Sequence, residues 1–515
     1  ENAQTTPIRA RTWTGSAWTA EVTGPTIDSP NNVFEGVVAA SSGSATNVVQ
    51  IAFGERDFYQ ATSAGLRKEP QLWSLTFDAK AQTFGSASIF SKGATFSYYQ
   101  PFGFDGNMVV YNGHTGRPNT RQYGISGFSS ETYPATVASQ AIRYTVIKAS
   151  PLRDEKVMAT LDSGGSVIAH VWRSGTGWGN AVTVATGLDG GGTGDFHFSR
   201  SYDVAYENAT GRALIIYTVA GSAAPKYRIW DDDTATWGSQ QDMPGTVGQT
   251  GTPWWIRAVS NPSPSSSEIT VVTLDNASDI FGYNWDGSTF DSADVLQLTG
   301  TAERAGGTNV PRYQPFDVAY EQTNYRAMVV WAEDNDDTFR YGFWVSTSAT
   351  WNSGVGTPNG YAGRQADTAA ASRLYQIRLA PDINSNRIAV AIGDSSLDLY
   401  AGVWSGSAWA TSALLGETEN VWTGLEDVTN KPSFDIAWEG DGDQAVVFAS
   451  DGSNNNIRNA WWRTGNSGWT VPIVYPDTQS DPQSIKAYAD PYLSLIHISE
   501  PTRLRRISYA VFCLK

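Results

Sequence analysis

An aromatic pair recurs nine times along the chain and constrains its fold more than any other feature of the sequence. In each copy an aromatic residue ends a stretch of β-type sequence, a turn rich in Gly, Ser, Thr and Asp follows, and a second aromatic comes after it. The copies are Trp13 with Trp18, Trp73 with Phe84, Tyr123 with Phe128 or Tyr133, Trp172 with Trp178, Trp230 with Trp237, Trp285 with Phe290, Trp344 with Trp351, Trp404 with Trp409, and Trp462 with Trp469. Successive first aromatics are 49 to 60 residues apart, and a repeat of that length indicates an array of small structural units.

The repeat between residues 312 and 355 contains four short stretches that are typical of β-strands. They span residues 316–321, 327–331, 340–344 and the segment after Trp351. The turns between them suit antiparallel hairpins. The second stretch is apolar at nearly every position, which is expected when both faces of a sheet are covered. Each unit is therefore expected to be a four-stranded meander.

These features predict an all-β fold, a β-propeller of four-stranded antiparallel blades. We expect about eight blades; nine blades, or parts of two propellers, are the alternatives. In such a fold the paired aromatics pack between neighbouring blades, and each buries about 150–250 Å².

The repeats also predict how the chain is divided. Residues 1–22 correspond to the third and fourth strands of a partial blade, 23–483 to eight blades, and 484–492 to the start of a further blade. We therefore expect a fragment at both ends. The two partial units could together complete one blade and close the ring, which would remove exposed sheet edges.

Residues 493–515 depart from the repeat in composition and carry the only cysteine of the chain, Cys513. The segment 493–503 resembles the translation of a transposase sequencing adapter, and the segment 507–515 resembles the far end of the same adapter. We therefore expect a non-native tail that does not integrate into the fold.

The charge and the cysteine content exclude several classes of function. The formal net charge is −16, and it becomes −19 without the tail, which holds four basic residues and one acidic residue. So acidic a chain disfavours nucleic acid as a partner. Without Cys513 the chain can form neither a disulfide nor a thiolate metal site. No apolar run approaches the roughly 18 residues of a membrane span, so we expect none in this fragment.

One loop has the composition of a cation site. Glu439-Gly-Asp441-Gly-Asp443 carries carboxylates at alternate positions, which suit a hard cation such as calcium, and it is similar to the loops of FG-GAP propellers. The corresponding loops of the other copies carry fewer carboxylates, so a solvated loop is the alternative. Calcium is the only cofactor candidate, because the three histidines outside the tail lie in no zinc-binding pattern.

Three copies carry an acid at the same position of the first strand, namely Asp203, Asp317 and Asp435. In a propeller these strands line the central channel. Acids there would favour cations or simple solvation and would disfavour an anionic sugar.

The third turn of each copy occupies the place of the Asp-box of sialidases, and Trp285-Asp-Gly-Ser-Thr-Phe290 resembles a shortened one. Enzymes of that family also need an arginine cluster, a Tyr nucleophile with a Glu partner, and an Asp acid. Their Phe/Tyr-Arg-Ile-Pro motif is absent; Tyr227-Arg-Ile-Trp230 comes nearest and lacks the proline. A glycan-active hydrolase of sialidase-like fold is therefore the alternative function.

The segment 457–469 is similar to blades of fungal fucose-binding propellers, which combine a period near 50 with an arginine in the third strand and a Gly-Trp ending. The resemblance implies sugar sites between blades, where an aromatic face and a bidentate arginine contact the ligand. The ligand-binding candidates in this chain are Arg228, Arg340, Arg458 and Trp462. The alternative is that these arginines only cross-link the blades.

The repeats also resemble those of uncharacterised bacterial or archaeal surface proteins. We therefore predict a secreted or cell-surface propeller that acts as a non-catalytic binding or structural module, with a glycan or another surface protein as its partner. An enzyme should break the repeat symmetry at one pole with clustered acids and arginines. A lectin or scaffold should keep equivalent residues in several blades.

Overall fold

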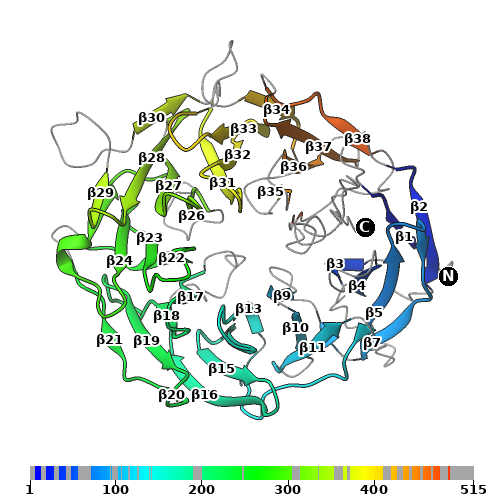
Figure 1. The fold of residues 1–515 in the computed structure, drawn as a ribbon, viewed down its shortest axis with the longest axis horizontal. Coiled ribbons are helices and arrows are strands. Elements are labelled where there is room, and N and C mark those ends of the chain that lie inside the picture. The colour runs from blue at the N-terminus through cyan, green and yellow to red at the C-terminus, as the bar shows by residue number, and fades with distance from the viewer. Residues whose placement is uncertain are drawn as a thin grey trace, which may run out of the picture.

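The computed structural model shows a ring of β-sheets that radiate from a central axis (Figure 1). It describes residues 6–12, 19–27, 34–41, 48–55, 71–92, 94–95, 102–105, 107–113, 116–124, 127–138, 140, 142–188, 200–245, 249–303, 314–334, 336–352, 364–367, 372–409, 419–425, 433–439, 444–452, 456–465, 468–475, 485 and 487. Within these residues there is no α-helix, and a single 3₁₀ turn spans Ser292–Asp294. In this part of the chain no helix has the length and apolar character that a membrane span requires.

Eight sheets, each with four antiparallel strand positions, make up the blades, so the predicted fold class is confirmed. Blade 1 comprises β3 (Phe34–Ser41), β4 (Val48–Glu55), β5 (Gln71–Asp78), β6 (Thr83–Phe84) and β7 (Ser88–Lys92); blade 2 comprises β8 (Ala94–Thr95), β9 (Phe102–Asp105), β10 (Met108–Gly113), β11 (Pro118–Gly124) and β12 (Gly127–Phe128); blade 3 comprises β13 (Ile142–Ala149), β14 (Glu155–Asp162), β15 (Val167–Arg173) and β16 (Gly177–Ala185); blade 4 comprises β17 (Tyr202–Tyr206), β18 (Ala213–Tyr217), β19 (Lys226–Asp231), β20 (Thr236–Trp237) and β21 (Gln241–Asp242).

The second half of the ring repeats this arrangement. Blade 5 comprises β22 (Pro253–Ser260), β23 (Ile269–Asp275), β24 (Ile280–Trp285) and β25 (Leu296–Thr299); blade 6 comprises β26 (Phe316–Tyr320), β27 (Arg326–Ala332), β28 (Thr338–Val345), β29 (Thr350–Asn352) and β30 (Arg364–Asp367); blade 7 comprises β31 (Leu374–Pro381), β32 (Ile388–Asp394), β33 (Asp398–Trp404) and β34 (Glu419–Thr423); blade 8 comprises β35 (Phe434–Trp438), β36 (Gln444–Asp451), β37 (Asn456–Arg463) and β38 (Ile473–Tyr475). In blades 1, 4 and 6 two short strands pair with the same third strand, so the outer position is split.

A ninth, two-stranded sheet pairs β1 (Thr6–Ala10) with β2 (Val22–Ile27) and packs against blade 1 through Ala10 and Val22. Its strands lie a few residues farther from the turn than the sequence analysis placed them. Its assignment to a partial blade, the further blade at 484–492 and the non-native character of the tail remain predictions, and the tail lies outside the described residues.

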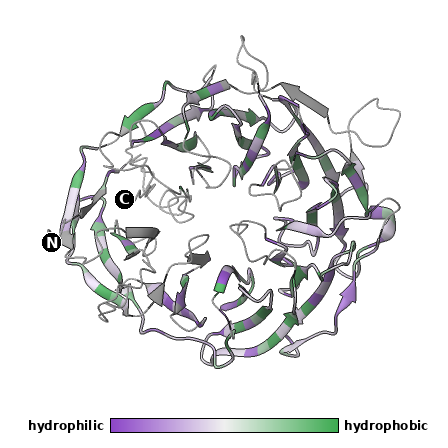
Figure 2. Ribbon diagram, turned by 180° about the vertical axis from the view of Figure 1, so that it is seen from behind, coloured by the Kyte–Doolittle hydropathy of each residue, from purple (hydrophilic) through white to green (hydrophobic). Residues whose placement is uncertain are grey.

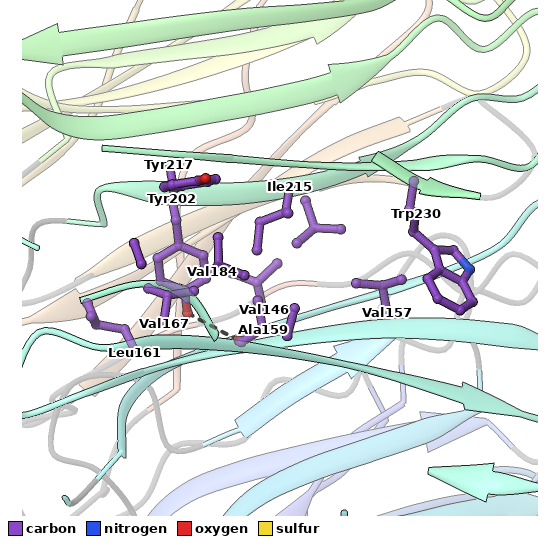
Figure 3. Close-up of a cluster of buried hydrophobic side chains, with 14 of the residues drawn as sticks. Val146, Val157, Ala159, Leu161, Val167, Val184, Tyr202, Ile215, Tyr217 and Trp230 are labelled. Atoms are coloured by element: carbon purple, nitrogen blue, oxygen red, sulfur yellow. Dashed lines mark hydrogen bonds between the residues drawn. The ribbon is translucent and has the colours of Figure 1, made fainter. Parts of the chain in front are cut away.

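The hydrophobic core lies between neighbouring blades. The second strands β14, β18, β23, β32 and β36 are buried at every residue, as the uniformly apolar stretches predicted. One cluster joins blades 3 and 4, where the Tyr202 hydroxyl donates to the Ala159 carbonyl at 3.3 Å and Trp230 closes the outer end (Figure 3). Hydrophobic segments recur in the strands around the ring (Figure 2), so each blade depends on its neighbours for burial.

The paired aromatics lie opposite one another across the third and fourth strand positions. Trp172 faces Trp178 and Trp344 faces Trp351, and the first aromatics of blades 3, 4, 6, 7 and 8 are at most 8% exposed. The prediction of burial between blades is confirmed for them, whereas Trp13 lies outside the described residues. The pairing of Trp73 with Phe84 was wrong: Phe77 faces Phe84, because β5 continues four residues beyond Trp73 before it turns.

A hydrogen bond repeated every second blade shows that the structural repeat is a pair of blades. An aspartate on the first strand of blades 2, 4, 6 and 8 accepts a 3.0 Å bond from a backbone N–H of the next unit. The pairs are Asp105 with Ala149, Asp203 with Ala258, Asp317 with Leu379, and Asp435 with Ala487. Ala487 therefore stands beside blade 8 as Ala258 stands beside blade 4.

Candidate ligand-binding clefts

The first aromatic of the repeat links each blade to the one before it. Its indole N–H donates to a buried carboxylate of the preceding blade. These pairs are Trp230 with Glu155 at 2.9 Å, Trp285 with Glu207 at 2.6 Å, and Trp404 with Glu321 at 2.7 Å. The third-strand face that carries this aromatic therefore looks toward the preceding blade, as do residues two and four positions earlier, because side chains alternate along a strand.

The register of the strands separates the three candidate arginines into two classes. Arg340 and Arg458 lie four residues before the aromatics Trp344 and Trp462, which face Ala327 and Ala445 of the second strands. Arg228 lies two residues before its aromatic. The sequence analysis treated the three as equivalent, and this was wrong because an equal distance from the start of a strand does not give an equal register.

Arg458 forms the strongest ion pair of the three. Its Nε and Nη2 donate to Asp451 Oδ2 at 2.9 and 2.6 Å, and Asp451 is fully buried. The guanidinium carbon lies 3.2 Å from the centre of the Trp422 ring in blade 7. Trp462 is 8% exposed and packs edge-on against Trp438, so its ring contributes to the core. These contacts join blade 8 to blade 7.

Arg340 occupies the same register in blade 6 but meets more accessible acids. Its Nη2 donates to Asp336 Oδ2 at 3.2 Å, and its Nε lies 3.8 Å from Glu333 Oε1. Both carboxylates are 24% exposed. The structure thus gives this arginine partners in its own blade.

Arg228 is engaged less completely. Its Nη1 donates to the Gly238 carbonyl at 2.9 Å, while its Nε has no hydrogen-bond partner within the described residues. The neighbouring Tyr217 hydroxyl donates to Gln240 Oε1 at 2.9 Å. Burial raises the pKa of Tyr217, so this hydroxyl remains a donor at neutral pH.

The cleft between blades 1 and 2 holds a larger polar cluster that the sequence analysis missed. Arg121, two residues before Tyr123, has the register of Arg228, and its Nη1 and Nη2 donate to the carbonyls of Ser129 and Phe90 at 2.6 Å each. Glu131 Oε2 accepts the Tyr111 hydroxyl at 2.6 Å. The Phe90 ring lies 4.7 Å from the Arg121 guanidinium, so both blades contribute to the cluster.

The rim of this cluster is open. The Tyr133 side chain is 49% exposed, and the Arg117 guanidinium lies over its ring at 3.8 Å. Arg117 also approaches Glu131 Oε1 at 3.9 Å, and these two side chains are 33% and 23% exposed. An accessible aromatic ring, a guanidinium and a carboxylate together can contact both the apolar face and the hydroxyls of a sugar.

The sequence contained a signal for this cluster that we did not use. Arg121 stands at the same distance before the repeat aromatic as Arg228 does. Tyr133 was considered only as the second aromatic of its copy, whereas Phe128 takes that position opposite Tyr123. Tyr133 is thereby left outside the structural pair.

The calcium candidate is only partly described. Glu439 is buried, and its backbone N–H donates to the Gln444 carbonyl at 2.8 Å; Asp441 and Asp443 lie outside the described residues. Glu439 follows its first strand as Glu207 and Glu321 follow theirs, and those two carboxylates bind an arginine and the tryptophan of the next blade. Calcium at this loop remains a prediction.

The acids of the central channel are paired. Arg200 Nη2 donates to Asp203 Oδ2 at 2.8 Å, and Arg257 Nε donates to Asp317 Oδ1 at 3.0 Å. Each aspartate also accepts the backbone bond to the next blade described above. The expectation that these acids favour cations is therefore wrong for Asp203 and Asp317, because arginines already neutralise them.

Comparison with known proteins places the chain among propellers at low sequence identity. No protein-family model and no curated protein matches it. The BP39L lectin from Burkholderia pseudomallei is similar, with 11% identity over 85% of this chain and 98% of the lectin and a TM-score of 0.46. The Dos1 propeller has 8% identity over 93% and 94% with a TM-score of 0.44. The Aleuria aurantia lectin in complex with α-methyl-L-fucoside has 17% identity over 64% and 94% with a TM-score of 0.33. The fold assignment itself rests on the strand pairing.

Proposed function

We propose that this chain is a non-catalytic binding propeller of the cell surface or the extracellular space, and that it binds a saccharide in the cleft between blades 1 and 2. The observation that carries the proposal is the exposed ring of Tyr133 beside Arg117 and Glu131. The repeat aromatics of five other blades are buried, whereas this ring is half accessible. It lies beside groups that can donate to and accept from hydroxyls.

The chemistry of the cleft fits a pyranose better than an apolar ligand. One face of a sugar ring is a patch of C–H groups, which packs on an aromatic ring, and its edge presents hydroxyls. Arg117 can donate to such hydroxyls and Glu131 can accept from them. Charge-assisted hydrogen bonds of this kind fix the orientation of a ligand.

A glycan array of the intact chain tests the proposal, run with and without calcium. We expect binding that Tyr133→Ala and Arg117→Ala each reduce by at least tenfold, because each removes a direct contact. Ile383→Ala is the matched control, since Ile383 is a comparably exposed hydrophobic residue of another blade, at 44%. Retention of full binding by both cleft variants would exclude this site, and turnover of any glycoside would favour the hydrolase alternative.

A further inference from the structure

Two clefts of the propeller contain copies of one polar arrangement. In blade 2 it consists of Arg121, Tyr111 and Glu131, and in blade 4 the matching residues are Arg228, Tyr217 and Gln240. The arginines lie opposite Val109 and Ile215, and the tyrosines lie two residues farther along the same second strands. Both arginines donate through Nη1 to the carbonyl that follows the second aromatic. Both tyrosines donate to the side chain three residues beyond that aromatic.

The two copies differ in charge at a single acceptor. Glu131 is a carboxylate that accepts the Tyr111 hydroxyl at 2.6 Å and the Ser91 hydroxyl at 2.6 Å. Gln240 is a neutral amide that accepts the Tyr217 hydroxyl at 2.9 Å and is exposed. The tyrosine contact is therefore compatible with either group, and the charge can change while the contact is kept.

The surroundings of Gln240 favour an anion more than those of Glu131 do. Arg228 Nε lacks a partner within the part of the chain that is described. Lys226 lies on the same strand and forms an ion pair with Asp242. A ligand carboxylate at this cleft would meet an incompletely used guanidinium and no negative charge at position 240.

We propose that residues 131 and 240 set the charge preference of the two clefts. The cleft between blades 1 and 2 binds a neutral, hydroxyl-rich saccharide, and the cleft between blades 3 and 4 binds a saccharide that carries a carboxylate. The inference rests on the proposed function. Two like charges about 5 Å apart in a half-exposed site interact strongly enough to change affinity on the order of tenfold.

Reciprocal substitutions in the full chain test this inference. The probes are methyl hexosides of the gluco, galacto and manno series, each paired with the corresponding methyl uronide, which differs only in its C6 carboxylate. Binding is measured by titration calorimetry on a background of Arg228→Ala to isolate the first cleft and of Arg121→Ala to isolate the second. In the first cleft Glu131→Gln should raise the uronide-to-hexoside affinity ratio about tenfold. In the second cleft Gln240→Glu should lower it about tenfold.

Gln241→Glu is the matched control, because it adds the same charge one residue away on an exposed side chain. It should change the ratio by less than twofold. Unchanged ratios in both swap variants would overturn this inference and leave the proposed function standing. Failure of the unaltered chain to bind any probe or any arrayed glycan would overturn both.

Discussion

Trp404 Nε1 donates a 2.7 Å hydrogen bond to Oε1 of Glu321, a fully buried carboxylate of the preceding blade. Arg326 holds the same carboxylate through two bonds of 2.7 and 2.6 Å, and it also donates to the Gly406 carbonyl in the turn that follows Trp404. The repeat aromatic is thus both a hydrophobic wedge and the donor that satisfies a charge between blades. Leaving a buried charged group short of a partner is expensive in free energy, which explains why a tryptophan suits this position.

Trp404→Phe should lower the free energy of unfolding by about 2–3 kcal/mol, because it removes ring area and a hydrogen bond to a buried carboxylate. Trp344→Phe is the control, since the Trp344 indole N–H has no partner within the described residues. That variant should lose only the smaller contribution from ring area. Urea unfolding measures both, and equal losses would show that the hydrogen bond contributes nothing.

Arg458 and Arg340 share a register but should differ in their contribution to stability. Arg458→Met leaves the buried Asp451 without its two donated bonds, and we expect a loss of about 3 kcal/mol. Arg340→Met affects partly exposed acids, and we expect a loss of no more than about 1 kcal/mol. Chemical denaturation of the two variants checks the ranking. A larger loss for Arg340→Met would contradict it.

Asp275 should make stability depend on pH in the direction opposite to an ordinary surface acid. Burial raises the pKa of Asp275 to about 6, and the nearby Asp279 adds to the effect, while backbone N–H donors oppose it. The folded state therefore holds the proton more tightly than the unfolded state. The contribution of this group is fully present below about pH 4 and is lost as the pH rises to about 6.

Asp275→Asn tests this dependence, because Asn can still accept the backbone bonds that Oδ1 receives from Ala277 and Asp279 at 2.8 and 2.9 Å. The variant should be more stable than the unaltered chain at pH 8, by roughly 2–3 kcal/mol, and similar to it at pH 4. Urea midpoints at the two pH values provide the measurement. A loss of stability at pH 8 would mean that the charge itself is needed.

The contact between Asp435 and Ala487 predicts how the end of the ring is held. A chain shortened to residue 492 should keep its melting temperature within about 2 °C, because residues 493–515 are expected to add no blade. A chain shortened to residue 484 should melt several degrees lower, because Ile485 is 1% exposed and packs on blade 8, and the bond to Asp435 is lost as well. Calorimetry of the two chains decides, and equal melting temperatures would argue against a ninth unit that begins here.

The sequence by itself determined the architecture. The aromatic period counts the blades, and the uniformly apolar second strands identify the buried centre of each sheet, because both signals arise from contacts inside one repeat or with the next. Trp230 and Trp404 were correctly expected to be buried for this reason. The pairing of Trp73 failed because a two-residue shift along a strand keeps a side chain on the same face, so the pattern alone does not fix the register.

Only the tertiary structure decided which polar residues meet. The cluster of Arg117, Arg121, Glu131 and Tyr133 is assembled by a third strand and by the segment beyond the second aromatic, and Phe90 of the preceding blade closes it. The alternation of blades, seen in the bond from Asp203 to Ala258, likewise depends on atoms about one repeat apart. Periodicity states how often a side chain recurs along the chain, whereas a site depends on which neighbour it faces and how far away that neighbour lies, and packing alone sets both.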